Sequence, residues 1–279
     1  MKLLNEHPIA LAVNYSPQAR ELYRSGQADF DYFKCPNWPD VLRDAQQVRP
    51  VYVHHEIMAG QDQPRDGDIR NLHESVESTG TPYINTHVAP LVADIAGYSD
   101  LEQFQQAHLR VAADIERLCA AFGPSRVIVE NVPWERRRDY PIACVAAAPA
   151  FVTGLLERTG AMLLLDLAHA AVAARESDEQ IRPFVEAHPL HRLRELHVTG
   201  FEDDPGGQIR DSMPMRSADW QLFAWALDRI ADGAWPRPWV ITLEYGGVGP
   251  HFEWRTNTAI LAEQLRQCAG LLRERGLRE

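Results

Sequence analysis

Eight short apolar runs recur along the chain, and each is followed by a segment whose apolar residues are spaced as on one helix face. Short runs that are apolar throughout are typical of strands buried in a parallel sheet. The runs occupy residues 9–13, 30–33, 51–55, 83–87, 127–131, 162–169, 195–200 and 240–246. The helical segments occupy residues 18–25, 39–48, 67–79, 101–122, 148–159, 177–187, 217–231 and 256–275.

This alternation of strand and helix predicts the fold class. Eight β-then-α units favour an α/β fold, a single (β/α)8 TIM barrel, over a doubly wound open sheet. The sequence contains no Gly-x-Gly-x-x-Gly motif, which also counts against a nucleotide-binding sheet. Its 279 residues suit one barrel of ~250 residues, and no linker or repeat divides them. We therefore predict one catalytic domain over residues 1–279.

Composition and charge limit the kinds of binding partner and the cellular compartment that we expect. A formal net charge of −11 argues against nucleic acid as a partner, because phosphate binding depends on clustered Lys and Arg. No stretch reaches the ~18 consecutive apolar residues of a membrane helix, and residues 1–8 do not resemble a signal peptide. The four cysteines are far apart in sequence and form no disulfide framework: Cys35, Cys119, Cys144 and Cys268. We expect a cytoplasmic protein.

Histidine and acidic residues end six successive strands of the predicted barrel. They are His54 or His55, His87, Glu130, Asp166, His197 and Glu244. The carboxyl ends of barrel strands meet at one mouth, so these side chains are expected to converge there. Imidazole and carboxylate together suit zinc, manganese or iron. Strand alternation lets only one of His54 and His55 face the mouth, and the sequence leaves that choice open.

Further donors lie just beyond the strands. His169 follows Asp166 by three residues and could bind another ion with Asp211, or support a neighbouring ligand. Lys34 could pair with a substrate anion or form a salt bridge at the barrel mouth. Asn131 could position substrate or a carboxylate, and Arg210 could bind a substrate carboxylate.

The strand-end residues resemble those of the xylose-isomerase-like TIM barrel superfamily, and more closely the multinuclear non-haem iron-dependent oxidases that modify ribosomally made peptides. The matching stretches are Val53-His54, Thr86-His87, Val129-Glu130-Asn131, Leu165-Asp166-Leu-Ala-His169, Glu195-Leu-His197-Val-Thr-Gly200, Asp211, Trp220-Gln-Leu-Phe223 and Leu243-Glu244. The resemblance covers roughly residues 9–270, and its most specific part is the Glu-x-His-x-x-Gly stretch followed by Asp, Trp and Glu.

The resemblance implies a set of ligands. One iron would be held by His54, His87 and Glu130, and a second by Glu130, Asp166, His197 and Glu244. A third would use His169, Asp211 and a histidine two residues after that aspartate. Met213 occupies this last position, and a thioether is a poor ligand for a hard ion, so the third site is expected to be weak. Strand two also carries Lys34 where a carboxylate is expected.

The resemblance therefore implies an enzyme with two Fe(II)/Fe(III) ions that uses dioxygen to modify a residue of a ribosomally made precursor peptide in natural-product biosynthesis, and cysteine is the residue that we expect to be modified. Glu130, His197 and Glu244 are the expected catalytic residues. A separate peptide-binding partner protein would deliver the peptide. The alternative is a sugar or hydroxy-acid isomerase or epimerase with Mn or Zn, in which Glu130 and Glu244 would transfer a proton beside a metal-polarised carbonyl.

Overall fold

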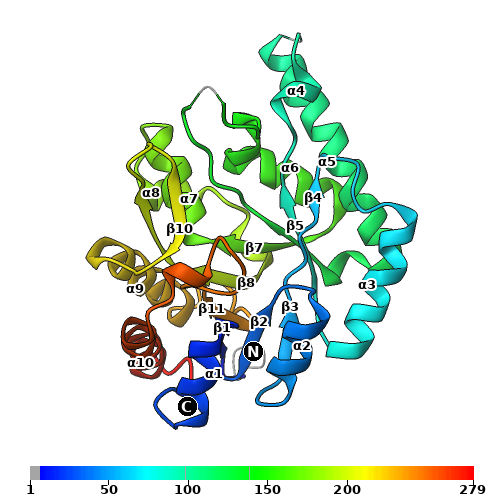
Figure 1. Cartoon of the computed structure of the whole chain (residues 1–279). Helices are drawn as coiled ribbons and strands as arrows, with labels where there is room; N and C mark the ends of the chain where they lie inside the picture. Colours follow the sequence, from blue (N-terminus) through cyan, green and yellow to red (C-terminus); the bar gives the residue numbers. More distant parts are fainter. Residues whose placement is uncertain (1–6, 98, 138) are drawn as a thin grey trace. The chain divides into compact units, whose positions relative to one another are not determined.

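The structure is a computed structural model that describes residues 7–97, 99–137 and 139–279. The chain forms two compact units (Figure 1). The terminal unit comprises Met1–Val53 and Leu193–Glu279, and the central unit comprises His54–Arg192. Residues 1–6, part of the segment used to argue against a signal peptide, lie outside the described residues. The single domain over 1–279 stays a prediction.

The terminal unit contains parallel strands in the order β3-β2-β1-β11-β8. Their bounds are β1 Ala10–Asn14, β2 Tyr32–Cys35, β3 Val51–Val53, β8 Leu193–Val198 and β11 Val240–Leu243. The helices are α1 Pro17–Arg24, α2 Pro39–Gln46, α9 Ser217–Ala231, α10 Thr258–Glu274 and the 3-10 turn η4 Glu253–Arg255. An antiparallel pair, β9 Gly200–Asp203 and β10 Ile209–Met213, follows β8.

The central unit contains parallel strands in the order β7-β6-β5-β4. They are β4 Met58–Ala59, β5 Ile84–Val88, β6 Val127–Glu130 and β7 Met162–Asp166. The α-helices are α3 Asp66–Thr79, α4 Val92–Ile95, α5 Asp100–Phe122, α6 Pro149–Thr159, α7 Leu167–Glu176 and α8 Ile181–Glu186. The 3-10 turns are η1 Pro124–Arg126, η2 Cys144–Ala147 and η3 Leu190–Arg192.

All eight predicted apolar runs contain a strand, and the helix α5 shows why the predictions succeed. Ser99 precedes α5, and its backbone N–H donates to Glu102 Oε2 at 3.0 Å, as in a capping box. Val111, Ile115 and Leu118 then repeat at helical spacing and are fully buried. The strands of both units are likewise buried on both faces for most of their length, as parallel strands usually are.

The structure differs from the sequence prediction after β7. We predicted a strand-like run that reaches His169 and no helix before 177–187. Instead, α7 begins at Leu167 and α8 covers only Ile181–Glu186. Residues 167–174 are buried on all sides, so they lack the alternation that marks a surface helix in sequence. Their alanine content nevertheless favours helix strongly. Short strands also form after the third and the seventh of the predicted strands, namely β4 within 58–66 and β9 and β10 within 199–216.

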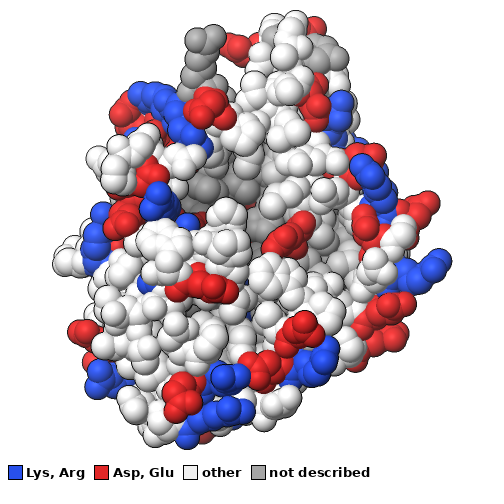
Figure 2. Space-filling model, viewed as in Figure 1, with Lys and Arg blue, Asp and Glu red and all other residues white. Residues whose placement is uncertain are grey.

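Charged side chains of both signs cover the outer helices. Figure 2 shows basic and acidic residues intermixed over α3, a pattern that produces no extended basic surface there. Among the described residues, no helix combines the length and the apolar composition needed to cross a membrane.

Candidate metal centre

Strand register brings the first two candidate ligands together in the central unit. β5 and β6 run parallel, and their pairing sets His87 beside Glu130, the last residue of β6. Paired residues of neighbouring strands point to the same face of a sheet, so both side chains extend to the same side. The position of each ligand therefore follows from the short apolar strand that precedes it.

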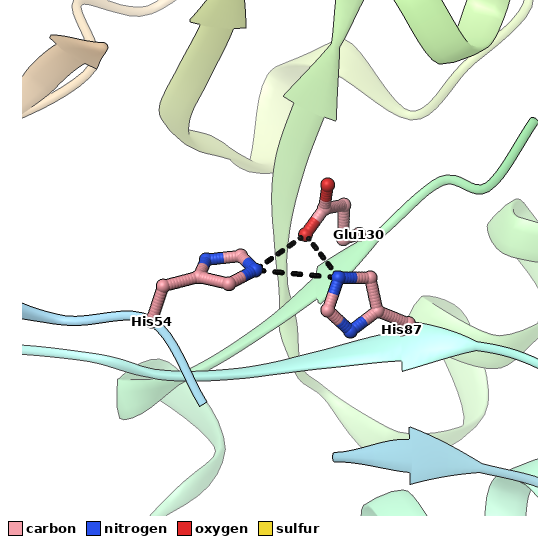
Figure 3. Close-up of side chains that lie close together, drawn as sticks. All are labelled: His54, His87 and Glu130. Atoms are coloured by element: carbon pink, nitrogen blue, oxygen red, sulfur yellow. Dashed lines mark hydrogen bonds and ion pairs between the residues drawn. The ribbon is translucent and has the colours of Figure 1, made fainter. Parts of the chain in front are cut away.

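His54, His87 and Glu130 form a compact group of potential ligands (Figure 3). Glu130 Oε2 lies 3.4 Å from His54 Nε2 and 3.1 Å from His87 Nε2, and the two ring nitrogens are 3.3 Å apart. One ligand atom from each residue lies within 4.8 Å of the other two. Two imidazoles and one carboxylate are a common donor set for non-haem iron, so these residues fit such an ion.

Backbone carbonyls orient the rings of two histidines among the candidate ligands. His87 Nδ1 lies 3.3 Å from Ile57 O, and His169 Nδ1 lies 2.9 Å from Asn131 O. A carbonyl oxygen can only accept, so each Nδ1 carries a proton and faces the backbone. This is how proteins commonly orient histidine ligands.

His54 and His55, between which the sequence could not choose a candidate ligand, have different surroundings. His54 joins the group just described, whereas His55 lies with its Nε2 3.3 Å from Ser75 Oγ. Burial lowers the pKa of His55 to about 4, although a hydrogen bond that the Asn85 side chain accepts from His55 opposes the shift. His55 is therefore a buried neutral residue beside the ligand group.

Asp166 and His169 extend the group at the start of α7. Asp166 caps this helix, because its Oδ1 accepts from His169 N at 2.8 Å. The His169 ring lies with Nδ1 3.5 Å from Glu130 Oε1 and Nε2 3.9 Å from Asp166 Oδ2. The side chain of Asn131, predicted to contact substrate or a carboxylate, bonds the backbone of Asp166 through both its oxygen and its nitrogen.

A second group of predicted residues lies in the terminal unit. His197, on β8, has its Nδ1 2.9 Å from Glu244 Oε1, and that same oxygen forms an ion pair with Lys34 Nζ. All three side chains are at most one-tenth exposed. Lys34 therefore takes the salt bridge that the sequence left as one of its two alternatives, and it supplies positive charge where a carboxylate was expected.

Glu195 belongs to this second group, and sequence analysis gave it no role. Its Oε1 accepts from Tyr52 OH at 2.8 Å and lies 2.7 Å from His197 Nε2. Burial, and then the charge of Glu195, hold the pKa of Tyr52 well above its usual value. The available signal was spacing, because residues two apart on a strand share a face, so Glu195 had to point the same way as His197.

The remaining candidates lie in β10 and are held by arginine contacts. Arg255 Nη1 donates to Asp211 O at 2.7 Å and lies 3.3 Å from its Oδ1. Arg210 Nη2 donates to Asp204 Oδ2 at 2.8 Å, and its guanidinium lies 5.2 Å from the Trp254 ring centre. Met213 is buried at the end of the same strand. The expectation of a weak third ion stays a prediction.

Comparison with solved structures establishes the class of fold. D-psicose 3-epimerase from Clostridium cellulolyticum H10 superposes with a TM-score of 0.56 and 12% identity, covering 97% of this chain and 100% of its own. An L-ribulose 3-epimerase gives 0.57 and 16%, with 94% of each chain covered. Endonuclease IV from Thermus thermophilus gives 0.51 and 14%, with 95% and 99% covered. The predicted class, an α/β protein with a xylose-isomerase-like TIM barrel fold, is confirmed.

Sequence comparison then gives the family. The chain belongs to the RiPP precursor modification enzymes MbnB/TglH/ChrH, whose family model matches residues 31–243. A UPF0276 protein of Caulobacter vibrioides is 27% identical over 248 residues, covering 85% of this chain and 83% of its own. The UPF0276 protein RB0508 of Rhizobium meliloti is 26% identical over 246 residues, covering 84% and 76%. The family resemblance seen in the sequence is confirmed, and it implies an enzyme with a peptide substrate.

Proposed function

We propose that this protein is a non-haem iron-dependent oxidoreductase of natural-product biosynthesis. It would use dioxygen to modify a cysteine residue of a ribosomally made precursor peptide. The observation that carries the proposal is the group of His54, His87 and Glu130 in a chain of this family. Two histidines and one carboxylate bind iron while leaving coordination positions for a substrate and for oxygen. Magnesium sites use oxygen ligands instead, whereas catalytic zinc sites can use the same two histidines and one carboxylate, so metal analysis has to separate iron from zinc.

The chain's own residues would hold and shield such an ion. Glu130 is almost fully buried, and its two oxygens have different neighbours. Oε2 lies near His54 and His87, and Oε1 lies near His169. A carboxylate placed in this way can serve two ions, which supports the bridging role proposed for it. When bound, iron would supply the redox chemistry with dioxygen as oxidant and the peptide as the group oxidised.

The rest of the ligand set is proposed from the sequence pattern. Two Fe(II)/Fe(III) ions are expected, with a weaker third site, and His197 and Glu244 are proposed to act with Glu130 in catalysis. Lys34, Asn131 and Arg210 remain proposed substrate contacts, although each has a protein partner here. A separate peptide-binding protein and a cytoplasmic location complete the proposal.

The test uses protein purified anaerobically and reconstituted with Fe(II). We expect at least two irons per chain, and oxygen uptake together with a mass change in a cysteine-containing precursor peptide. His54→Ala should lose the iron that His54 is proposed to hold, together with the activity. The matched variant His55→Ala should keep its iron, because His55 lies against Ser75 rather than Glu130. One iron or none in the wild-type protein would refute the multinuclear proposal. Equal iron loss in both variants would refute the ligand assignment.

The isomerase or epimerase with Mn or Zn is distinguished by the same residues. Its proton transfer would need carboxylates but neither His54 nor His87. The double variant His54→Ala and His87→Ala should therefore abolish an oxidase and leave most of an isomerase's activity. Turnover of a small carbonyl compound without oxygen, retained in the double variant, would replace our proposal with this alternative.

A further inference from the structure

Lys34 differs from the other basic residues of the chain in its side chain and in its position. Of the 28 Lys and Arg residues, only Lys2 and Lys34 are lysines. Lys2 lies outside the described residues, whereas Lys34 lies on β2 with 10% of its side chain exposed. An ammonium is a compact charge on a flexible stem, whereas a guanidinium is a rigid fork. Lys34 is therefore a cation that can change partners without movement of its strand.

Strand register sets the Lys34 ammonium beside Glu244. At the end of β1, Asn14 pairs with Lys34 of β2, and the residue before Asn14 pairs with Leu243 of β11. Glu244 follows Leu243, so Lys34 and Glu244 lie at the same level on the two sides of β1. Their ion pair forms at Glu244 Oε1, the oxygen that also lies 2.9 Å from His197 Nδ1. An ion bound there by His197 and Glu244 would meet the Lys34 ammonium.

Neither charge of this ion pair can lose its partner without a replacement. Both side chains are largely buried, and removal of one partner of a buried ion pair is strongly destabilising, because the other charge is left uncompensated. An ammonium that stayed in place would repel a metal ion at the same carboxylate oxygen. A metal ion can therefore replace Lys34 at Glu244 only if the displaced ammonium finds another anion. The two new partners, a cation for Glu244 and an anion for Lys34, favour each other's binding.

We propose that Lys34 binds a carboxylate of the peptide substrate and thereby controls metal binding in the terminal unit. Its ammonium leaves Glu244 for the substrate carboxylate, and Glu244 then binds an ion together with His197. The anions of an unmodified ribosomally made peptide are the carboxylates of its Asp and Glu side chains and of its C-terminus, so the ligand of Lys34 belongs to this class. The metal ion and the peptide rest on the proposed function, whereas the exchange of partners rests on the ion pair itself.

The exchange of partners couples two binding events. A carboxylate bound at Lys34 raises the affinity of the terminal unit for a metal ion, and by thermodynamic linkage the ion raises the affinity for the carboxylate by the same factor. Couplings of this kind typically amount to about 5- to 150-fold. Without a peptide, Lys34 lowers the affinity of this site for the ion but does not prevent excess metal from filling it.

Titration of metal-free protein with Co²⁺, followed by visible absorption, tests the coupling. The binding phase of the terminal unit is identified by its loss in Glu244→Gln. Three probes are compared: acetyl-triglycine with its C-terminal carboxylate, acetyl-Gly-Glu-Gly-amide with its side-chain carboxylate, and the uncharged acetyl-triglycine-amide. We expect a carboxylate probe to raise the Co²⁺ affinity of this phase at least about fivefold and the uncharged probe to leave it unchanged. The probe with the larger effect identifies the source of the carboxylate.

Lys34→Met shows whether the carboxylate acts through the ammonium. Without that charge, Co²⁺ should bind tightly in this phase with no probe, and a carboxylate probe should add nothing. Lys34→Gln, whose amide can still donate to Glu244, is the second neutral variant if Lys34→Met does not fold. Arg266→Met removes an exposed charge of α10 and should behave like the wild-type protein. A carboxylate effect that persists in the neutral variants would mean that the probe binds the ion directly, and it would overturn the proposal.

The remaining outcomes separate this proposal from the proposed function. Equal Co²⁺ affinity with and without the carboxylate probes would support a metal site and overturn the role of Lys34. If the wild-type protein binds no Co²⁺ under any condition, the proposed function fails, and isothermal titration of the probes into metal-free protein decides the role of Lys34. Carboxylate binding that is lost in Lys34→Gln would then support Lys34 as a carboxylate site, whereas no binding would overturn both.

Discussion

Two carboxylates, Glu130 in the central unit and Glu244 in the terminal unit, end strands in similar ways but have different neighbours. Glu130 lies against the imidazoles of His54, His87 and His169. Glu244 lies against one imidazole, that of His197, and forms an ion pair with the Lys34 ammonium. Imidazoles are potential ligands that can bind an ion together with a carboxylate, whereas an ammonium has no lone pair to offer.

The difference teaches which carboxylate is prepared for a metal ion. An ion placed beside Glu130 would meet further donors, since its neighbours can turn lone pairs toward it. An ion placed beside Glu244 would have to compete with Lys34 for the same oxygen. If Glu244 binds metal as the sequence predicts, the Lys34 ion pair must open first. The structure therefore makes the central unit the stronger candidate for metal binding.

The largest expected effect is that of Glu130→Gln. The amide of glutamine keeps the shape of the side chain but removes its negative charge, which lies next to all three imidazoles. We therefore expect complete loss of bound iron and of activity. Metal analysis after anaerobic reconstitution measures this. Glu157→Gln, an exposed substitution on α6, serves as the control and should retain iron. Retention of one ion in Glu130→Gln would show that Glu130 does not bridge two.

Lys34→Met addresses the other side of the comparison. Removing the ammonium leaves Glu244 as a largely buried carboxylate without its cation, and such losses cost about 3 kcal/mol in free energy of unfolding. Urea denaturation of the metal-free protein measures the loss. The double variant Lys34→Met and Glu244→Gln should recover much of it, because the unneutralised charge is then gone. A fully stable single variant would mean that the ion pair contributes nothing.

Acid should weaken the central unit through His188, which is buried there. Burial lowers the pKa of His188 to about 4, so the folded state resists protonation that the unfolded chain accepts near pH 6.5. The free energy of unfolding is therefore highest above pH 6.5 and decreases as the pH drops from 6.5 to 4. At about 1.4 kcal/mol for each unit of pKa shift, His188 accounts for a decrease of ~3 kcal/mol. The slope of the free energy of unfolding against pH should fall to about half in His188→Leu, because burial also lowers the pKa of His55 to about 4. The exposed His191→Gln should leave the slope unchanged, and an equal slope in both variants would assign it to other groups.

The smallest effect is expected for His169→Ala. His169 lies beside Glu130, yet the close group of ligand atoms is formed by His54 and His87. We expect iron content to stay at two ions and activity to change by less than about tenfold, since His169 would support its neighbours rather than hold these ions. Metal analysis and oxygen uptake check this. If His169→Ala lost as much iron as His54→Ala, His169 would have to be a metal ligand as well.

The strands and the polar residues that end them were predictable because short apolar runs mark buried parallel strands, and the next polar residue marks the strand end. His54 could not be chosen over His55 from sequence, because the choice depends on Asn85 and Ser75, which are distant in the chain. The pairing of Lys34 with Glu244 was equally hidden, since 210 positions separate the two residues. The start of α7 was missed because a helix buried all round has no alternating pattern.

Asp166 is the last residue of β7 and the cap of α7, so strand passes into helix with no loop between them. No loop residue is therefore available there to absorb a change in chain length. One residue inserted after Asp166 would rotate every later position of α7 by about 100° around the helix axis. His169 would then leave both Glu130 and the Asn131 carbonyl. Insertions that other strand-to-helix connections of a barrel absorb easily should be excluded at this point, and the length of the chain here is as much a part of the site as the identity of its side chains.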